Sequence, residues 1–110
     1  MSSEGTERTA VVLSAIDKVS IAFDLKEEDA SLSTDTLLTL MREALVQRIV
    51  ALLNTNPERL MAILYRIDVS EEQVNEIFST AMPPDVPDLL ADLIIERQLR
   101  KAETRRYYKS

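Results

Sequence analysis

The chain has 110 residues, which suit one domain with its own hydrophobic core. Nineteen acidic and thirteen basic side chains give a net charge of −6, so most of the surface is expected to repel nucleic acids. The absence of cysteine excludes disulfides and thiolate sites, and the longest apolar run, residues 49–53, is far shorter than the roughly 20 residues of a membrane-spanning helix.

The N-terminal third gives two competing patterns. Residues 1–8 are predicted to form a disordered tail. Apolar residues then recur at helical spacing, at Val12, Ile16, Val19 and Phe23. Residues 19–25 also alternate as a strand would, but an isolated strand would have no partner in this sequence. Residues 9–33 are therefore predicted to be an N-terminal helix followed by a charged linker.

Residues 35–53 form the most apolar predicted helix. Polar side chains occupy only a narrow stripe of its circumference, so the helix is expected to lie centrally and contact several neighbours. Ser33 or Thr34 is placed to cap its start. Asn56 followed by Pro57 then predicts the cap and first residue of a second helix that runs to about Ile67.

The stretch from Leu60 to Ile77 resembles a helix-turn-helix. The helical pattern breaks at residues 68–70 and resumes after Ser70, which starts a capping box with Gln73 and predicts a helix over residues 71–80. Asp68 stands where such turns often have glycine, and aspartate tolerates the left-handed backbone that the turn needs. The second helix carries three glutamates where a DNA reader needs basic or amide side chains, at Glu71, Glu72 and Glu76. A packed helical hairpin is the favoured interpretation.

Residues 82–87 contain three prolines and predict a stiff connector. A long amphipathic helix is expected from Asp88 to about Arg106. Five apolar residues are available for its buried face, namely Leu89, Leu90, Leu93, Ile94 and Leu99. A second set follows at a spacing of four and predicts an exposed ladder of ion pairs, namely Asp92, Glu96 and Arg100.

The sequence offers few groups for catalysis. There is no histidine, so the commonest general base and metal ligand is absent. The only glycine is Gly5, so no glycine-rich phosphate loop is expected. No serine or aspartate has an evident activator. The chain is therefore not expected to be an enzyme, and no cofactor, metal or small-molecule substrate is predicted.

Basic residues gather at the C-terminal end. Residues 93–110 contribute six basic and two acidic side chains, net +4, whereas residues 1–92 contribute seven and seventeen, net −10. The candidate interaction surface joins this basic end to the end of the second helix, and comprises Tyr65, Arg66, Asp68, Glu96, Arg97, Arg100, Lys101, Arg105, Arg106 and Tyr107. Two interpretations of Arg66 stay open. It either pairs internally with Asp68 or with a carboxylate of the last helix such as Glu96, or it flanks a partner's carboxylate together with Arg97.

Two segments carry a family resemblance. LYRIDVSE at residues 64–71, and LIIERQ at residues 93–98 continuing through Lys101 and Thr104-Arg105, resemble a group of short, uncharacterised bacterial helical proteins. The resemblance covers roughly residues 37–107. It implies a small bacterial protein of the cytoplasm and no activity, and it assigns no role to any residue.

The sequence thus predicts an all-α protein, a single small bundle of four to five helices with a helix-turn-helix-like hairpin and a core domain over residues 34–107. The expected function is a protein–protein interaction or accessory module without catalytic activity, binding an unknown protein or a second copy of itself. The alternative is a DNA-associated regulator that uses residues 57–80 or the basic C-terminal helix. The first residues show no secretory signal, so the expected location is the cytoplasm.

Overall fold

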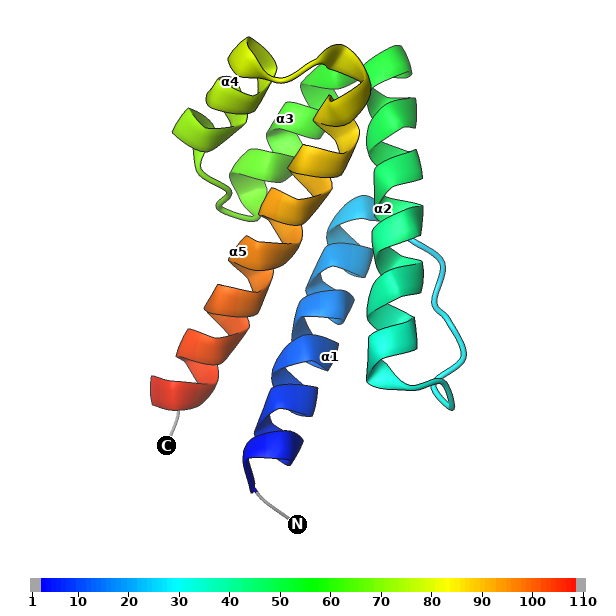
Figure 1. Ribbon diagram of the computed structural model, residues 1–110, viewed down its shortest axis with the longest axis vertical. Helices are drawn as coiled ribbons and strands as arrows, with labels where there is room; N and C mark the ends of the chain where they lie inside the picture. Colours follow the sequence, from blue (N-terminus) through cyan, green and yellow to red (C-terminus); the bar gives the residue numbers. More distant parts are fainter. Residues whose placement is uncertain (1–2, 109–110) are drawn as a thin grey trace.

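The computed structural model describes the backbone of residues 3–108 and the side chains of residues 7–105. It confirms the predicted all-α bundle, since no strand occurs within residues 3–108 (Figure 1). The elements are α1 (Ser3–Phe23), α2 (Thr34–Thr55), α3 (Pro57–Arg66), α4 (Glu71–Thr80), the 3-10 helix η1 (Pro83–Asp85) and α5 (Val86–Tyr108). Within the part of the chain that the structure describes, no helix has the length and apolarity needed to cross a membrane.

The N-terminal segment is a helix and not a strand. Val12, Val19 and Phe23 are buried on one side of α1, as the helical spacing predicts. The prediction of a tail over residues 1–8 differs from the structure, in which α1 begins at Ser3, while residues 1–2 lie outside the described residues.

The helices α1 and α2 run in the same direction, so the segment between them must return along the bundle (Figure 1). We call residues 24–33 the strap. The end of α1 is level with Arg48, whose Nε donates to the Phe23 carbonyl at 3.0 Å. The part of α2 before this point, residues 34–48, is about 21 Å long along the helix axis. The strap has to cover that length in the opposite direction, and its ten residues can span at most about 33 Å. The strap therefore returns along the outside of the bundle, with a turn at residues 29–32 before α2 begins.

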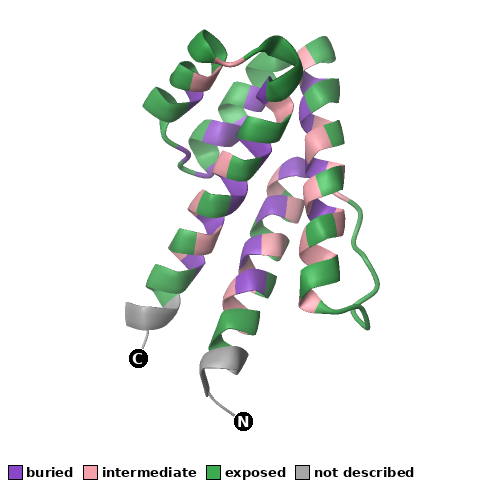
Figure 2. Ribbon diagram, in the orientation of Figure 1, coloured by how far each residue is buried: buried purple, intermediate pink, exposed green. Residues whose placement is uncertain are grey.

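The helix α5 lies at the centre of the contacts. It packs against α1, α2 and α4, and its buried residues include Leu90, Ile94 and Ile95. The predicted central helix, α2, contacts α1, α3 and α5, but it buries only one stripe and leaves the opposite side to solvent (Figure 2). The core cluster also contains Val19 and Phe23 of α1, so the N-terminal helix belongs to the same core.

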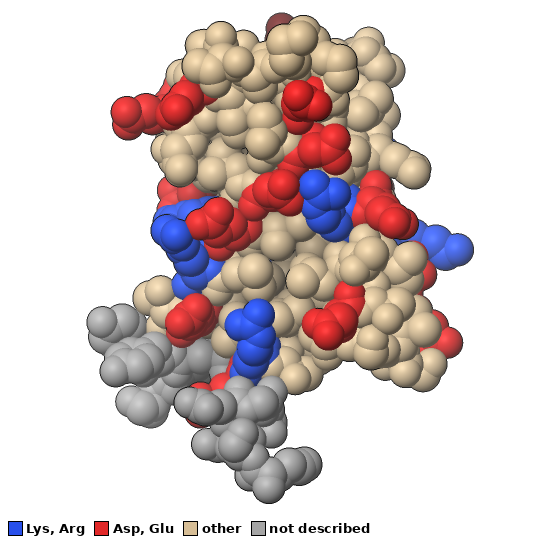
Figure 3. Space-filling model, in the orientation of Figure 1, with Lys and Arg blue, Asp and Glu red and all other residues tan. Residues whose placement is uncertain are grey.

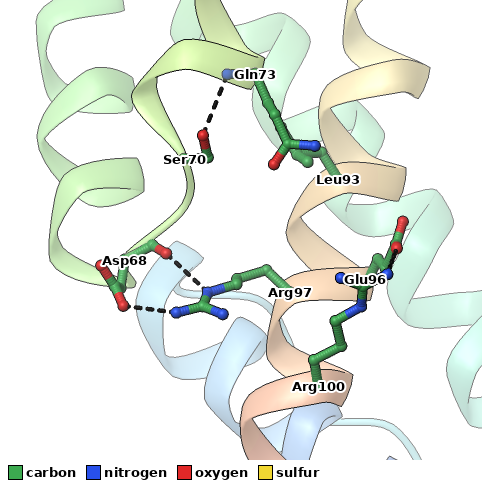
Figure 4. Close-up of a pocket in the computed structure, with 7 residues that line it drawn as sticks. All are labelled: Asp68, Ser70, Gln73, Leu93, Glu96, Arg97 and Arg100. Carbon is green, nitrogen blue, oxygen red and sulfur yellow. Dashed lines mark hydrogen bonds and ion pairs between the residues drawn. The ribbon is translucent and has the colours of Figure 1, made fainter.

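The predicted caps are present. The hydroxyl or amide oxygens of Ser33, Asn56 and Ser70 each accept from the backbone N–H three residues later, at 3.2 to 3.3 Å. The Gln73 side chain does not complete the expected capping box, because it lies toward Leu93 on α5 (Figure 4). This placement leaves the amide of Gln73 available at the surface between α4 and α5.

Two predictions for α5 need correction. Leu89 is 41% exposed and not buried, because it lies on the side of α5 away from the buried stripe that contains Val86, Leu90 and Ile94. The ladder of ion pairs is also incomplete. Glu96 pairs with Arg100 at 2.7 Å, but Asp92 accepts from Arg42 Nε of α2 at 2.8 Å instead. This cross-helix bond raises the pKa of Arg42.

Candidate interaction surface

The turn between α3 and α4 is fastened to α5 by two consecutive side chains. Arg97 Nε donates to the Asp68 carbonyl at 3.0 Å, and an Arg97 terminal nitrogen meets Asp68 Oδ2 at 2.8 Å. Gln98 Nε2 donates to the Ile67 carbonyl at 2.9 Å. Two carbonyls at the end of α3, which accept no hydrogen bond within the helix, thereby accept hydrogen bonds from side chains of α5.

The geometry of this turn depends on aspartate at residue 68. Asp68 has φ of 63°, in the left-handed region. The Val69 N–H donates to the Leu64 carbonyl and the Asp68 N–H to the Tyr65 carbonyl, which is the Schellman arrangement that usually has glycine at this position. A carboxylate adds something that glycine cannot supply, namely the ion pair to Arg97.

Arg97 also lowers the pKa of the Asp68 carboxyl below 3.8, chiefly through the side-chain hydrogen bond, with smaller contributions from the charges of Arg97 and Lys101. A carboxyl whose pKa is lower in the folded chain stabilises the fold above its unfolded pKa. That contribution disappears as the pH falls through the folded value.

We therefore expect Asp68→Asn to destabilise the protein at neutral pH, where asparagine keeps the left-handed backbone but loses the charge. The difference in free energy of unfolding between wild type and variant is expected to be complete above about pH 5 and to shrink as the pH falls below the usual value of 3.8. Urea unfolding of both chains at several pH values measures it. A difference that stays constant down to acid pH contradicts this role of the charge.

A shallow pocket of about 300 Å³ lies between this turn and α5. It is lined by Asp68, Ser70, Gln73, Leu93, Glu96, Arg97 and Arg100 (Figure 4). Four of these residues belong to the surface that the sequence predicts, and the structure brings them together from two segments, the turn after α3 and the helix α5. Two ion pairs border the pocket, one apolar side chain contributes to its lining, and a serine and an amide complete the opening. Such a lining accepts one polar side chain of a partner.

The basic residues of α5 form one continuous edge. We call Arg97, Arg100, Lys101 and Arg105 the cationic edge. Three of them recur every fourth residue and Arg100 precedes Lys101, so their side chains follow one another along the exposed part of the helix. Two of the predicted surface residues, Arg106 and Tyr107, lie on the last turn of α5, and their side chains are outside the described residues.

The predicted internal pair of Arg66 is wrong. Among the residues whose side chains the structure describes, Arg66 forms no ion pair, and Asp68 and Glu96 pair with Arg97 and Arg100 instead. Arg66 is exposed at the end of α3, and its neighbour Tyr65 is 85% exposed. An exposed cation and an exposed aromatic ring therefore precede the turn that the cationic edge holds in place.

Sequence reasoning missed Gln98, which is 1% exposed. Its Nε2 is bonded, but its Oε1 has no hydrogen-bond partner among the described residues. A signal for its burial was present, because Leu90, Ile94, Gln98 and Ala102 recur every fourth residue and the other three are apolar. Because buried polar groups are normally hydrogen-bonded, a glutamine at such a position is expected to form a structural hydrogen bond. Here that bond is to the Ile67 carbonyl at the end of α3.

The second helix of the hairpin is acidic in the folded protein. Glu71, Glu72 and Glu76 are all exposed on α4, and only Val74 of this helix is buried (Figure 2). If α4 entered a groove of DNA, these carboxylates would lie near the phosphates and repel them. Within residues whose side chains the structure describes, no group of three or more acidic or other ligating side chains is placed to hold a metal ion.

No protein family, curated protein or solved structure matches this chain. The resemblance of residues 37–107 to short bacterial proteins stays a prediction.

Proposed function

We propose that the protein is a protein–protein interaction module without catalytic activity, and that its cationic edge binds an acidic segment of a partner protein. The observation that carries this proposal is the separation of charge. Four basic side chains follow one another along the C-terminal half of α5 in a chain whose net charge is −6. On the face drawn in Figure 3, acidic side chains outnumber basic ones over most of the body.

The contacts within the edge support an acidic partner. Arg97 and Arg100 are paired with Asp68 and Glu96, while Arg105 is exposed and Lys101 is half-buried. A paired arginine can still bind a partner's carboxylate, because its guanidinium retains donors beyond those bound to the first carboxylate. Arg97 also donates to the Asp68 carbonyl, so less side-chain ordering is needed when a partner binds there.

Groups around the edge supply contacts other than charge. The pocket beside Leu93 exposes Ser70 and Gln73, and Tyr65 projects at the end of α3. Tyrosine and arginine are enriched in protein interfaces because each combines a large contact area with directed hydrogen bonds. This combination of polar, aromatic and basic side chains suits a protein segment better than a DNA duplex. The phosphates of a duplex would also be repelled by the glutamates of α4.

Binding of a fluorescein-labelled glutamate-rich peptide, followed by anisotropy, tests the proposal. The double variant Arg100→Glu with Arg105→Glu is expected to weaken binding by about tenfold or more, since each reversed exposed contact changes the affinity by roughly 1 kcal/mol. Added salt is expected to weaken binding of the wild-type chain and to have little effect on the variant.

The matched control is Lys18→Glu with Arg59→Glu, which makes the same change of charge at exposed positions on α1 and α3. It is expected to bind the peptide far better than the edge variant does. An equal loss of peptide binding in both variants would show that the effect depends on net charge and not on the cationic edge. If the protein binds duplex DNA of random sequence at low salt and does not bind the peptide, the DNA-associated alternative replaces this proposal.

A further inference from the structure

A second surface, distinct from the cationic edge, lies under the strap. Between α1, the strap and α2 there is a groove of about 280 Å³, which we call the strap groove. Its apolar part includes Leu13 and Ile16 of α1 together with Leu37 and Leu40 of α2. Leu13 is 42% exposed, and the other three are half-buried.

The groove follows from the topology. The strap has to connect two parallel helices along the outside of the bundle, and it does so with the charged sequence of residues 26–29 (Figure 1). Its ends are fixed, because Arg48 contacts Phe23 and Asp24 at one end and Ser33 caps α2 at the other. Leu25 and Ala30 of the strap line the groove, but the charged residues 26–29 between them supply no further apolar side chain to fill the space beneath the strap.

The border of the groove is acidic. Asp17 of α1 and Glu27 and Glu28 of the strap line it, against the single cation Lys26. Asp29 adds a further negative charge to the strap, and the bonds from Ser31, above all from its backbone N–H, lower the pKa of that carboxyl. An apolar groove with such a border selects a ligand that combines apolar or aromatic groups with positive charge.

We infer that the strap groove holds the cationic C-terminal end of a second copy of this chain. The inference rests on the proposed function, since it identifies the acidic partner segment of the cationic edge as the strap of another copy. The chemistry is complementary on both sides. After Arg105 the sequence continues with Arg106, two tyrosines and Lys109, which joins aromatic rings to positive charge.

The geometry requires a second copy. The chain's own α5 runs to Tyr108 and ends on the side of α1 away from the strap (Figure 1). Arg105 and the three residues after it belong to this helix, so they cannot lie in the groove of the same chain.

The net charge of −6 on each copy does not oppose this contact at moderate salt. Two bundles in contact have centres separated by more than 20 Å, given the shortest extent of 21 Å. This separation exceeds the Debye length of about 8 Å at physiological ionic strength. The ion pairs in the contact lie within about 4 Å and are much less screened, so the local complementarity determines whether the copies associate.

Sedimentation velocity from micromolar to near-millimolar protein tests the inference on the full chain. The wild type is expected to associate as its concentration rises, and less so at high salt. Glu27→Lys with Glu28→Lys reverses the groove border, and Arg105→Glu with Arg106→Glu reverses the C-terminal end. Each double variant alone is expected to self-associate about tenfold more weakly or worse.

An equimolar mixture of the two variants is the decisive sample. In this mixture the cationic end of the groove variant can bind the acidic groove of the C-terminal variant. The acidic end of the C-terminal variant can bind the cationic groove of the groove variant, so association is expected to return. The control is Glu72→Lys with Glu76→Lys on α4, which changes the charge as the groove variant does but is expected to associate like wild type. Circular dichroism verifies that every variant is folded.

Three outcomes overturn the inference: a wild type that is monomeric throughout, a groove variant that associates as wild type does, or a mixture that does not recover. The peptide assay separates this failure from failure of the proposed function. A monomeric wild type that still binds the glutamate-rich peptide overturns the second copy as partner and leaves the cationic edge as a binding site. A chain that does neither overturns both.

Discussion

Replacing Gln98 with glutamate is expected to destabilise the protein by about 3 to 5 kcal/mol at neutral pH, the cost of leaving a buried charge without a partner. Gln98 is 1% exposed, and its Oε1 already has no hydrogen-bond partner among the described residues. A negative charge at this atom would be desolvated without compensation. For a domain of this size, that loss is a large part of the usual 5 to 15 kcal/mol or so of stability.

The pH dependence of this variant distinguishes charge from shape. Burial raises the pKa of an introduced glutamate above its ordinary value, so the folded chain binds the proton more tightly than the unfolded chain. The variant's deficit relative to wild type is therefore expected to grow as the pH rises from about 4.3 through the raised pKa. At acid pH the neutral carboxyl is close to the shape of glutamine, and its O–H can donate to the Ile67 carbonyl.

Gln98→Met is the matched control. It has a similar volume, adds no charge and removes the unpaired Oε1, at the loss of the bond to Ile67. Its free energy of unfolding is expected to fall by about 1 kcal/mol and to differ from wild type equally at every pH. Urea unfolding followed by circular dichroism measures all three chains. Glutamate and methionine variants of equal stability at neutral pH would show that water reaches this site.

Leu90→Ala is expected to lower the free energy of unfolding by about 3 kcal/mol and the melting temperature by about 10 to 20 °C. Leu90 has no exposed surface and belongs to the core that α5 shares with α1 and α2. Truncation leaves a cavity at the point where these helices meet. Because the core is continuous, the loss is expected in one cooperative transition.

The neighbouring residue provides the control, since Leu89→Ala removes the same atoms one position earlier. Leu89 is 41% exposed, so its truncation is expected to lower the free energy of unfolding by less than about 1 kcal/mol. Thermal melts of the two variants in the same buffer make the comparison. Similar losses in both would mean that α5 is rotated from the orientation described, and that Leu89 belongs to the core.

Local signals in the sequence predict the helices well. Ser33, Asn56 and Ser70 precede helices at the positions where their side chains accept from the backbone, and all three caps are present. Asp68 takes the left-handed conformation expected of it. These features depend on residues within one turn of each other, so neighbouring sequence is enough to specify them.

The partners of charged side chains were predicted less well. Arg97 pairs with Asp68 and Arg42 with Asp92, each across a long separation in sequence, whereas the predicted pair of Arg66 is wrong. Several acceptors lie within reach of a long cationic side chain in any plausible packing of helices. Which acceptor it contacts depends on the rotation and axial position of each helix, and spacing along the chain does not contain that information.

The sequence by itself determined that this protein is a bundle of helices, where the three helices with side-chain caps begin, and that its basic charge lies at one end, because propensity, capping and composition act locally. Only the tertiary structure decided that α5 occupies the centre, that Gln98 is buried, and that the strap crosses between parallel helices and leaves an acidic-bordered groove. Those features depend on how separate helices pack, and packing is decided by the sum of many weak contacts over the whole chain.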